Sequence, residues 1–317
     1  MSIDYLRVSV TDRCNLRCIY CNPLGDCGFI DRREILRFEE IHRIVGLFAE
    51  CGISKVRLTG GEPLVRKNIV ALVKKLAATA GIEELALTTN GVFLEQMAGE
   101  LKAAGLRRVN ISVDSVEREN YKRITGFDFL EKVTRGIYKA IEVGLTPVKI
   151  NTVVLKGINE QDVPALARLS VEMPVTIRFI EYCPTDKNTA ANGFFVPNSR
   201  VRRIIEHNFG PLSAAITTDN NGPALYFRIK NSAGAIGFIS GRTTVFCHLC
   251  NRLRLTSDGK VRPCLYSAHH YDIKELIRNG ADDEQILALL ERIIAEKHRY
   301  TKLNSPAGQF SMRNVGG

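Results

Sequence analysis

The stretch TDRCNLRCIYCN at residues 11–22 places Cys14, Cys18 and Cys21 within a single loop. A strand predicted at residues 5–10 leads directly into this loop, and the ends of strands are where α/β enzymes display their reactive groups. A four-iron cluster normally takes four cysteines, so a loop with three leaves one iron open to a ligand. A zinc site and a redox-active Cys-x-x-Cys pair are the simpler alternatives.

A second motif, Gly60-Gly61-Glu62-Pro63, follows the next predicted strand, where glycines let the backbone approach a ligand closely. The two motifs, with Tyr20 before the last cysteine of the loop, resemble those of radical S-adenosylmethionine (SAM) enzymes. The resemblance implies a [4Fe-4S] cluster that binds SAM and cleaves it to a 5'-deoxyadenosyl radical. It also implies SAM contacts from Tyr20, Gly61, Ser112 and Cys183, although relatives usually have methionine at the position of Cys183.

Composition indicates an ordinary globular protein of one large or two modest domains, with 317 residues of which 45% are hydrophobic. We see no apolar signal region and no apolar run of membrane-spanning length, and therefore expect a cytoplasmic protein without a membrane partner. Metal binding explains six of the nine cysteines better than disulfides do, which leaves Cys27, Cys51 and Cys183 over. The net charge of +10 favours an anionic partner.

A short β-branched strand followed by a longer amphipathic stretch recurs up to about residue 181. Several of the amphipathic stretches end at a glycine, which is a common helix stop. This alternation predicts a parallel sheet, and six units rather than eight predict a partial (β/α)6 barrel, the fold of the radical SAM family. We assign this barrel to residues 1–215. The strands are expected at residues 5–10, 55–59, 84–89, 108–114, 147–154 and 175–181.

Polar and apolar residues alternate along these strands, so helices should cover the apolar face and the polar face should line the barrel. The polar face carries the cations Arg7, Arg57, Lys149 and Arg178. Buried cations need partners, so this lining predicts a site for a highly charged anion. The alternative is that Asp114 and Glu181 neutralise the cations internally.

The pattern changes after residue 181. Residues 184–199 are polar and rich in turn formers, and we expect a loop there that could cover the barrel mouth. A helix at 199–207 and an antiparallel hairpin of residues 224–229 and 235–240 should follow. Residues 216–317 are therefore expected to form a smaller α+β region.

This region carries a second set of cysteines, Cys247, Cys250 and Cys264. Structural zinc, completed by His248 or His269, is the main alternative on spacing alone. Between the cysteines Arg252 and Arg254 share one face of a predicted strand, and two arginines beside a metal site are typical of an anion clamp.

The run FCxxCNRLRLTxDGK and the third cysteine resemble the GTP 3',8-cyclase family, the radical SAM lyases that begin molybdenum cofactor biosynthesis. The resemblance implies a second [4Fe-4S] cluster on the later cysteines, with GTP between the two clusters, and a Gly-Gly tail, here residues 316–317, that inserts toward the active site. It further implies hydrogen removal from C3' of the GTP ribose and attack of that carbon on C8 of guanine, guided by Arg7, Arg252 and Arg254. The implied GTP contacts are Arg7, Arg57, Thr88, Lys149, Arg178, Arg252, Leu253 and Arg254.

Other partners follow from this chemistry. We expect an electron donor, whose identity the sequence does not give, and a downstream enzyme that accepts the product, with a homodimer as one option for the assembly. A peptide-modifying radical SAM enzyme is one alternative function. A zinc-stabilised nucleic-acid binder is the other, but the chain has no tryptophan and no basic stripe interleaved with aromatic residues, so we expect no nucleic-acid partner.

Overall fold

The computed structural model of the chain describes residues 3–21, 28–183, 193–215, 222–244 and 246–302. Cys27, residues 184–192 of the predicted loop over the barrel mouth, and the Gly-Gly end lie outside these residues. No helix in the described ranges is long and apolar enough to cross a membrane.

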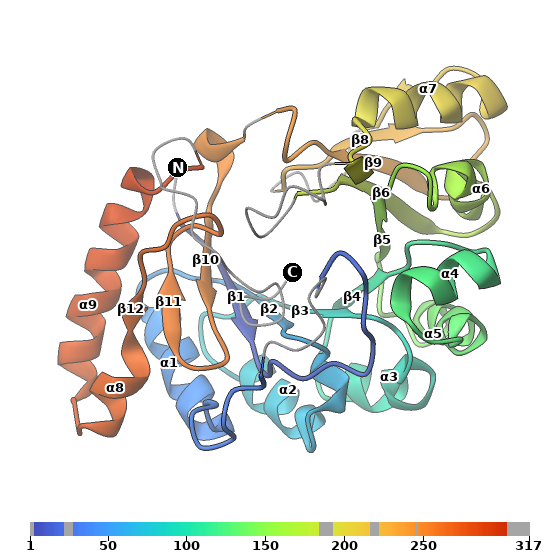
Figure 1. Ribbon diagram of the computed structural model, residues 1–317. Coiled ribbons are helices and arrows are strands. Elements are labelled where there is room, and N and C mark those ends of the chain that lie inside the picture. Colours follow the sequence, from blue (N-terminus) through green and yellow to red (C-terminus); the bar gives the residue numbers. More distant parts are fainter. Residues whose placement is uncertain (1–2, 22–27, 184–192, 216–221, 245, 303–317) are drawn as a thin grey trace.

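Six parallel strands form the centre of the molecule and confirm the predicted barrel (Figure 1). Each strand pairs with the next one along the chain, from β1 through β6, and the predicted bounds are correct to within two residues at every end. The two outermost strands of the sheet do not pair with each other, so the barrel is open. The central strands are β1 (Tyr5–Ser9), β2 (Lys55–Thr59), β3 (Glu84–Thr89), β4 (Arg108–Ser112), β5 (Val148–Val154) and β6 (Val175–Glu181).

The C-terminal region extends both edges of this same sheet. β9 (Ala235–Ile239) pairs with β6 in parallel, and β10 (Arg252–Leu255) pairs with β1 in parallel. β9 also pairs antiparallel with β8 (Leu225–Arg228), which confirms the predicted hairpin. The remaining strands are β7 (Ser213–Ala214), β11 (Lys260–Arg262) and β12 (Tyr271–Asp272), each antiparallel to its neighbour.

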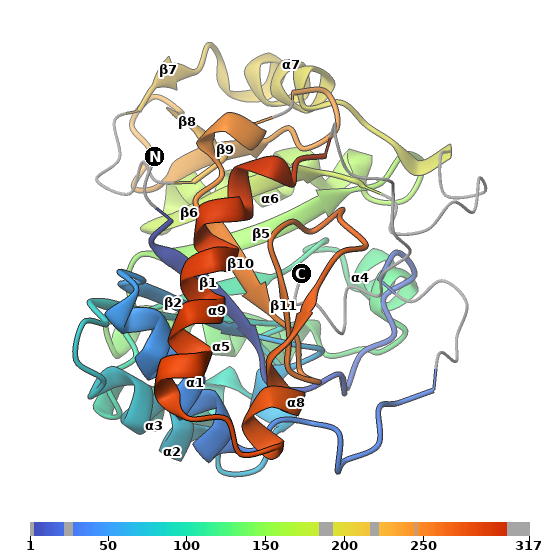
Figure 2. The ribbon, with the colours of Figure 1, turned by 90° about the vertical axis from the view of Figure 1, so that its left-hand side faces the viewer.

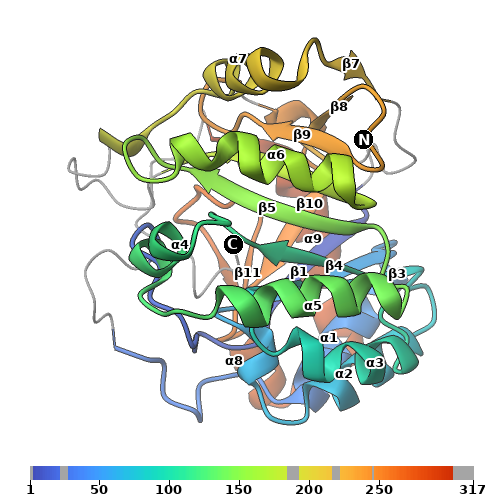
Figure 3. The same cartoon turned by 90° about the vertical axis from the view of Figure 1, so that its right-hand side faces the viewer.

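Helices cover the outside of the sheet. α1 to α3 lie against its lower part, and α4 to α6 flank the side seen in Figure 3. α9 runs along the opposite side beside α1, as Figure 2 shows. The helix predicted at 199–207 is α7, one or two residues longer at each end. The bounds are α1 (Phe38–Glu50), α2 (Ile69–Ala77), α3 (Leu94–Ala103), α4 (Arg118–Thr125), α5 (Leu130–Glu142), α6 (Val163–Glu172), α7 (Asn198–Phe209), α8 (Ile273–Arg278) and α9 (Asp283–Glu296).

The predicted division of the strand faces is confirmed. In β1 Leu6 and Val8 are fully buried and belong to the main hydrophobic cluster, together with residues of the covering helices such as Leu72 of α2. Arg7, between them, lines a chamber inside the barrel. The apolar face therefore drives helix packing, and the polar face is left to build a site.

Candidate functional site

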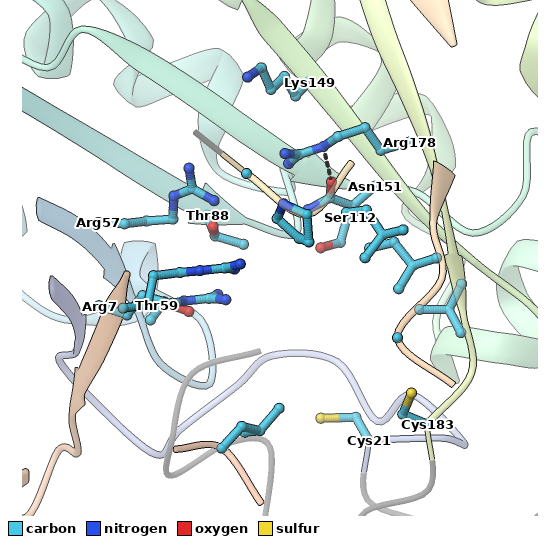
Figure 4. Close-up of a pocket in the computed structure, with 18 of the residues that line it drawn as sticks. Arg7, Cys21, Arg57, Thr59, Thr88, Ser112, Lys149, Asn151, Arg178 and Cys183 are labelled. Carbon is cyan, nitrogen blue, oxygen red and sulfur yellow. Dashed lines mark hydrogen bonds between the residues drawn. The ribbon is translucent and has the colours of Figure 1, made fainter. Parts of the chain in front are cut away.

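A chamber of about 380 Å³ occupies the inside of the barrel. All six central strands contribute side chains to its wall, and β10 adds two arginines. Its size is in the range of pockets that hold one or two small ligands. In Figure 4 Arg57, Lys149 and Arg178 lie toward one end of the chamber, and Cys21 and Cys183 lie toward the other.

The loop with three cysteines follows β1 and forms one wall of the chamber. Cys14, Cys18 and Cys21 all line it. The main chain of Arg17 and Ile19 donates hydrogen bonds to carbonyls at the end of α4, at 2.9 and 3.0 Å, which holds the loop against the barrel. The tertiary structure thus places all three thiols in the lining of one chamber.

The surroundings of these thiols suit a cluster of iron and sulfur. Leu16 N and Asn90 Nδ2 donate to Cys14 Sγ at 3.4 and 3.8 Å, and N–H donors to sulfur are a recurrent feature of such sites. Burial, followed by the charges of Asp114, Cys21 and Cys14, raises the pKa of Cys18 well above its usual value. A bound cation reverses that effect by stabilising the thiolates. Within the described residues no three His, Cys, Asp or Glu side chains are grouped as ligands of a single metal ion.

The Gly60-Gly61-Glu62-Pro63 motif packs against the cysteine loop. Gly61 N donates to Thr11 O at 2.7 Å, and a Cβ on Gly61 would lie 2.3 Å from Arg13 O. The sequence suggested that these glycines admit a ligand, whereas the structure shows that they also admit the backbone just before Cys14. Residue 61 must therefore be glycine for the two loops to meet.

The carboxylate of Glu62 joins the loops that follow β2 and β3. Its carboxylate accepts hydrogen bonds from Leu64 N at 2.9 Å, Thr89 Oγ1 at 2.8 Å and Asn90 N at 2.7 Å. Burial raises the pKa of Glu62 to about 7 despite these bonds. The loops after β2 and β3 are thereby joined beside the cysteines.

The residues predicted to contact SAM share the wall next to the cysteines. Tyr20, Gly61, Ser112 and Cys183 all line the chamber. The Tyr20 hydroxyl donates to Asp114 Oδ2 at 2.7 Å, and burial raises the pKa of Asp114 to about 6. All four therefore belong to the lining of the same chamber.

The four inward cations line the same chamber. Arg178 donates to Asn151 Oδ1 and to Asn110 Oδ1, each at 2.8 Å, so neutral amides orient its guanidinium without neutralising it. The two carboxylates suggested as internal partners are occupied elsewhere. Asp114 accepts from Tyr20 and from the main chain of Val153. Glu181 accepts from the main-chain N–H groups of Asn198, Arg242 and Thr243 and from the hydroxyl of Thr243.

β10 adds Arg252 and Arg254 to these cations. Its parallel pairing with β1 sets Arg254 beside Arg7, and both arginines line the chamber. Burial and then the charge of Arg252 lower the pKa of Arg254 to about 10. Burial and the charge of Arg254 likewise lower the pKa of Arg7. Mutual repulsion of this kind is relieved by a bound anion.

Two further residues predicted to contact the nucleotide differ in their placement. Thr88 of β3 lines the chamber. Leu253 is fully buried in the hydrophobic core, on the face of β10 opposite Arg252 and Arg254. A contact from Leu253 would have to come from its main-chain atoms.

The C-terminal cysteines flank the chamber from the β10 side. Cys247 lies in the short helix η4 (Cys247–Leu249), Cys250 follows it, and Cys264 follows β11. All three are partly buried. The residue next to each of them in the sequence lines the chamber wall, namely Phe246, Asn251 and Leu265. The three cysteines are not themselves among the residues that line the chamber, but the charges of Cys250 and Cys264 act on Arg254, which does line it.

Their environment is cationic and rich in donors. Burial opposes ionisation of Cys250, but Lys297 and Arg252 outweigh it and lower the pKa of this thiol. Lys302 N donates to Cys247 Sγ at 3.4 Å. His269, suggested as a zinc ligand, packs between the rings of Tyr271 and Tyr300, with centroid distances of 4.6 and 5.0 Å.

Three residues of the site had no role assigned to them from the sequence, although the alternation along the strands already placed Asn110 and Asn151 on the inward face. Tyr5, Asn110 and Asn151 belong to the inward faces of their strands, and Tyr5 and Asn151 line the chamber. Strand alternation could have identified Tyr5, which lies two residues before Arg7. Of the cysteines left over, Cys51 lies at the end of α1 and is not among the residues that line the chamber.

Comparisons with known proteins agree with this geometry. Residues 8–170 match the Radical SAM superfamily, and residues 175–303 match the family Molybdenum Cofactor Synthesis C. The chain is 44% identical over 317 residues to a GTP 3',8-cyclase of Pelotomaculum thermopropionicum, covering 99% of this chain and 98% of that one. It is equally similar, 44% over 319 residues, to a GTP 3',8-cyclase of Moorella thermoacetica, with 99% and 98% covered.

Solved structures share the fold at low identity. Streptococcus suis SuiB bound to S-adenosylmethionine superposes with a TM-score of 0.62 at 17% identity, covering 91% of this chain and 68% of SuiB. Native anSMEcpe with bound AdoMet gives a TM-score of 0.62 at 16% identity, covering 95% and 81%. Both likenesses support the open barrel.

Proposed function

Because the chain belongs to the GTP 3',8-cyclase family of the radical SAM superfamily, we infer that it converts GTP to (8S)-3',8-cyclo-7,8-dihydroguanosine 5'-triphosphate. This is the first step of molybdenum cofactor biosynthesis. The observation that supports it most directly is a single chamber with three cysteines in one wall and at least four inward cations. Such a chamber suits a radical cofactor together with a polyanionic nucleotide.

The protein uses an iron–sulfur cluster and SAM, and we propose that Cys14, Cys18 and Cys21 hold the cluster. When bound, these groups supply the one-electron cleavage of SAM that yields a carbon radical able to take a hydrogen atom from the ribose. The protein itself contributes by holding SAM in position. Tyr20, Gly61, Ser112 and Cys183 would hold SAM, and the Tyr20–Asp114 hydrogen bond fixes the tyrosine ring at the chamber wall.

The cations would bind and orient GTP. Arg57, Lys149 and Arg178 would take the triphosphate, and Thr88 and the main chain at Leu253 would add polar contacts. Arg7, Arg252 and Arg254 would hold the ribose and base so that C3' and C8 meet, a positioning role that removes the entropy cost of ring closure. The fixed charges need no reorganisation during the reaction because the strands already hold them in place.

The second cysteine set is proposed to carry another [4Fe-4S] cluster. Its support is the position of Cys247, Cys250 and Cys264 beside the chamber and next to Arg252 and Arg254. An electron donor and an enzyme that takes up the cyclised nucleotide would complete the reaction sequence.

An anaerobic turnover experiment tests this function. The protein is reconstituted with iron and sulfide, supplied with reductant and SAM, and assayed for 5'-deoxyadenosine with and without GTP. We expect 5'-deoxyadenosine together with the cyclised nucleotide when GTP is present, and little of either without it. Formation of 5'-deoxyadenosine that is indifferent to GTP would contradict GTP as the substrate.

The role of the second cysteine set is tested by Cys264→Ala. We expect this variant to bind about half of the wild-type iron and to lose nucleotide cyclisation, because one of two clusters loses a ligand. Cys51→Ala, which removes a thiol at the end of α1 that belongs to neither cysteine set, is the matched control and should keep both iron and activity. Robust turnover by Cys264→Ala would refute the second cluster.

A further inference from the structure

Tyr5 begins β1 and faces the same way as Arg7, since the two are separated by one residue. In the register of the sheet it lies opposite Lys55 of β2 on one side and Arg252 of β10 on the other. Only 8% of the surface of Tyr5 is exposed, and the residue is part of the chamber lining. Tyr5 is thus a buried aromatic residue of the inner wall, although the sequence analysis assigned it no role.

The Tyr5 hydroxyl is buried and has no hydrogen-bond partner among the described residues. A buried hydroxyl without a partner is costly, and native proteins rarely keep one without reason. The ring itself is well packed, because the guanidinium of Arg57 lies over it at 5.3 Å from the centroid. Packing therefore explains an aromatic ring at this position but does not explain the hydroxyl.

Three arginines are neighbours of Tyr5 on the inner wall. Arg7 lies on the same face of β1, Arg57 lies over the tyrosine ring, and Arg252 lies opposite Tyr5 in the register of β10. Each of these guanidinium groups can only donate hydrogen bonds, so none can accept the proton of the tyrosine. The acceptor that this corner lacks is an oxygen atom, and the local charge favours an anionic one.

We propose that the Tyr5 hydroxyl donates a hydrogen bond to a phosphate oxygen of GTP and so belongs to the triphosphate-binding site. The inference rests on the proposed function, since it takes GTP as the ligand. Arg57 stacks on the tyrosine ring and binds the same phosphate group, so that ring and guanidinium orient one another. Loss of the hydroxyl alone should therefore weaken the recognition of phosphate and leave the recognition of the nucleoside intact.

The test is Tyr5→Phe, which keeps the ring and removes only the hydroxyl. Binding of GTP and of guanosine to the reconstituted protein without SAM is measured by isothermal titration calorimetry under anaerobic conditions. We expect the Kd for GTP to rise about tenfold or more, as for the loss of a hydrogen bond to a charged group, while the Kd for guanosine stays within about twofold.

The Tm of the protein without nucleotide is an independent readout, because a ligand-binding hydroxyl and a structural hydroxyl predict changes of opposite sign. If the hydroxyl gains its hydrogen-bond partner only when the ligand binds, its removal eliminates a buried unpaired group from the free protein. The Tm of Tyr5→Phe should then equal or exceed that of the wild type. A structural hydroxyl would instead lower the Tm on removal. Tyr121→Phe, which removes a hydroxyl from a buried side chain outside the chamber lining, is the control and should leave both Kd values unchanged.

Three results would overturn the inference. They are an unchanged Kd for GTP, an equal loss of affinity for guanosine, and a clearly lowered Tm in the absence of nucleotide. A wild-type protein that binds neither GTP nor guanosine would instead remove the proposed function and, with it, the ligand assigned to Tyr5.

Discussion

At the scale of single residues, neutral groups hold one of the charges of the chamber, Arg178, in place. Arg178 is fixed by the amides of Asn110 and Asn151, and these bonds leave its positive charge available. Such an arrangement costs folding free energy, because buried cations repel one another and lose hydration. A polyanionic ligand recovers that free energy on binding, so affinity and stability are linked through the same side chains.

Gly61 gives the sharpest prediction at this scale. A methyl group at this position would lie 2.3 Å from Arg13 O and 2.6 Å from Arg13 C, both backbone atoms that cannot move without displacing the cysteine loop. We expect Gly61→Ala to lower the free energy of unfolding by about 2 kcal/mol, in the range of overpacked sites, and to reduce iron bound on reconstitution. Chemical denaturation and iron analysis measure the two effects.

Gly46 provides the matched control for this substitution. It lies inside α1, and nothing comes within 4 Å of a Cβ placed there. Gly46→Ala should raise the free energy of unfolding by about 0.5–1 kcal/mol, because alanine is the better helix former. Equal behaviour of the two variants would show that the close approach of the loops at Gly61 is unimportant.

At the scale of elements, one buried carboxylate joins the C-terminal region to the first helix of the barrel. Glu40, in the first turn of α1, accepts hydrogen bonds from Arg278 Nε at 2.9 Å and from Arg278 Nη2 at 3.1 Å. Arg278, at the end of α8, also donates to the main chain of Arg33 at 2.7 Å. Two helices that are distant in sequence are thereby held at a fixed distance.

This contact predicts an acid-sensitive contribution to stability. Burial opposes ionisation of Glu40, but the bonds from Arg278 and Arg37 outweigh it and lower the pKa of Glu40 to about 2 from 4.5. A lowered folded pKa means that the contribution is complete above pH 4.5 and disappears as the pH falls toward 2. We expect Glu40→Gln to cost about 2 kcal/mol at pH 7, after allowance for screening of the partly exposed Arg278.

Denaturant unfolding between pH 7 and pH 3 measures this effect. The difference between wild type and Glu40→Gln should shrink as the pH falls through this window. Glu131→Gln removes an exposed partner of Arg135 and should have no measurable pH-dependent effect. A constant difference across the window would mean that Glu40 stabilises the protein by packing and not by its charge.

At the scale of the whole molecule, one continuous sheet connects the barrel to the C-terminal region. β10 covers the edge of β1, and β9 covers the edge of β6. A sheet edge left open offers unpaired N–H and C=O groups to other chains. The domain boundary predicted at residue 215 stays a prediction, and the pairing across it implies that neither part is independent.

A truncated chain tests this dependence. Residues 1–215 alone lack β9 and β10, so both outer strands of the barrel would be exposed, and we expect aggregation or loss of cooperative unfolding. A chain of residues 1–302 retains every named strand and should remain monodisperse with native circular dichroism. Size-exclusion chromatography compares the two, and a monodisperse, cooperatively unfolding 1–215 fragment would show that the barrel needs no cover.

Local patterns in the sequence determined the elements and much of the site. The alternation of residues in β1 to β6 predicted which face is buried, because a strand has a period of two and covering helices require an apolar side. The spacing of Cys14, Cys18 and Cys21 predicted that they lie together, since a loop of eight residues cannot separate them far. Arg7, Arg57, Lys149 and Arg178 followed from the same alternation and do line one chamber.

Only the tertiary structure decided how distant segments meet. Nothing in the local pattern of residues 252–255 indicates that this strand pairs with residues 5–8, because backbone hydrogen bonds between strands carry no side-chain signature across so many residues. That pairing sets Arg254 beside Arg7 and Arg252 beside Tyr5. Local periodicity therefore determined which residues face inward, whereas strand pairing at the open edges of the barrel decided which charges share one chamber.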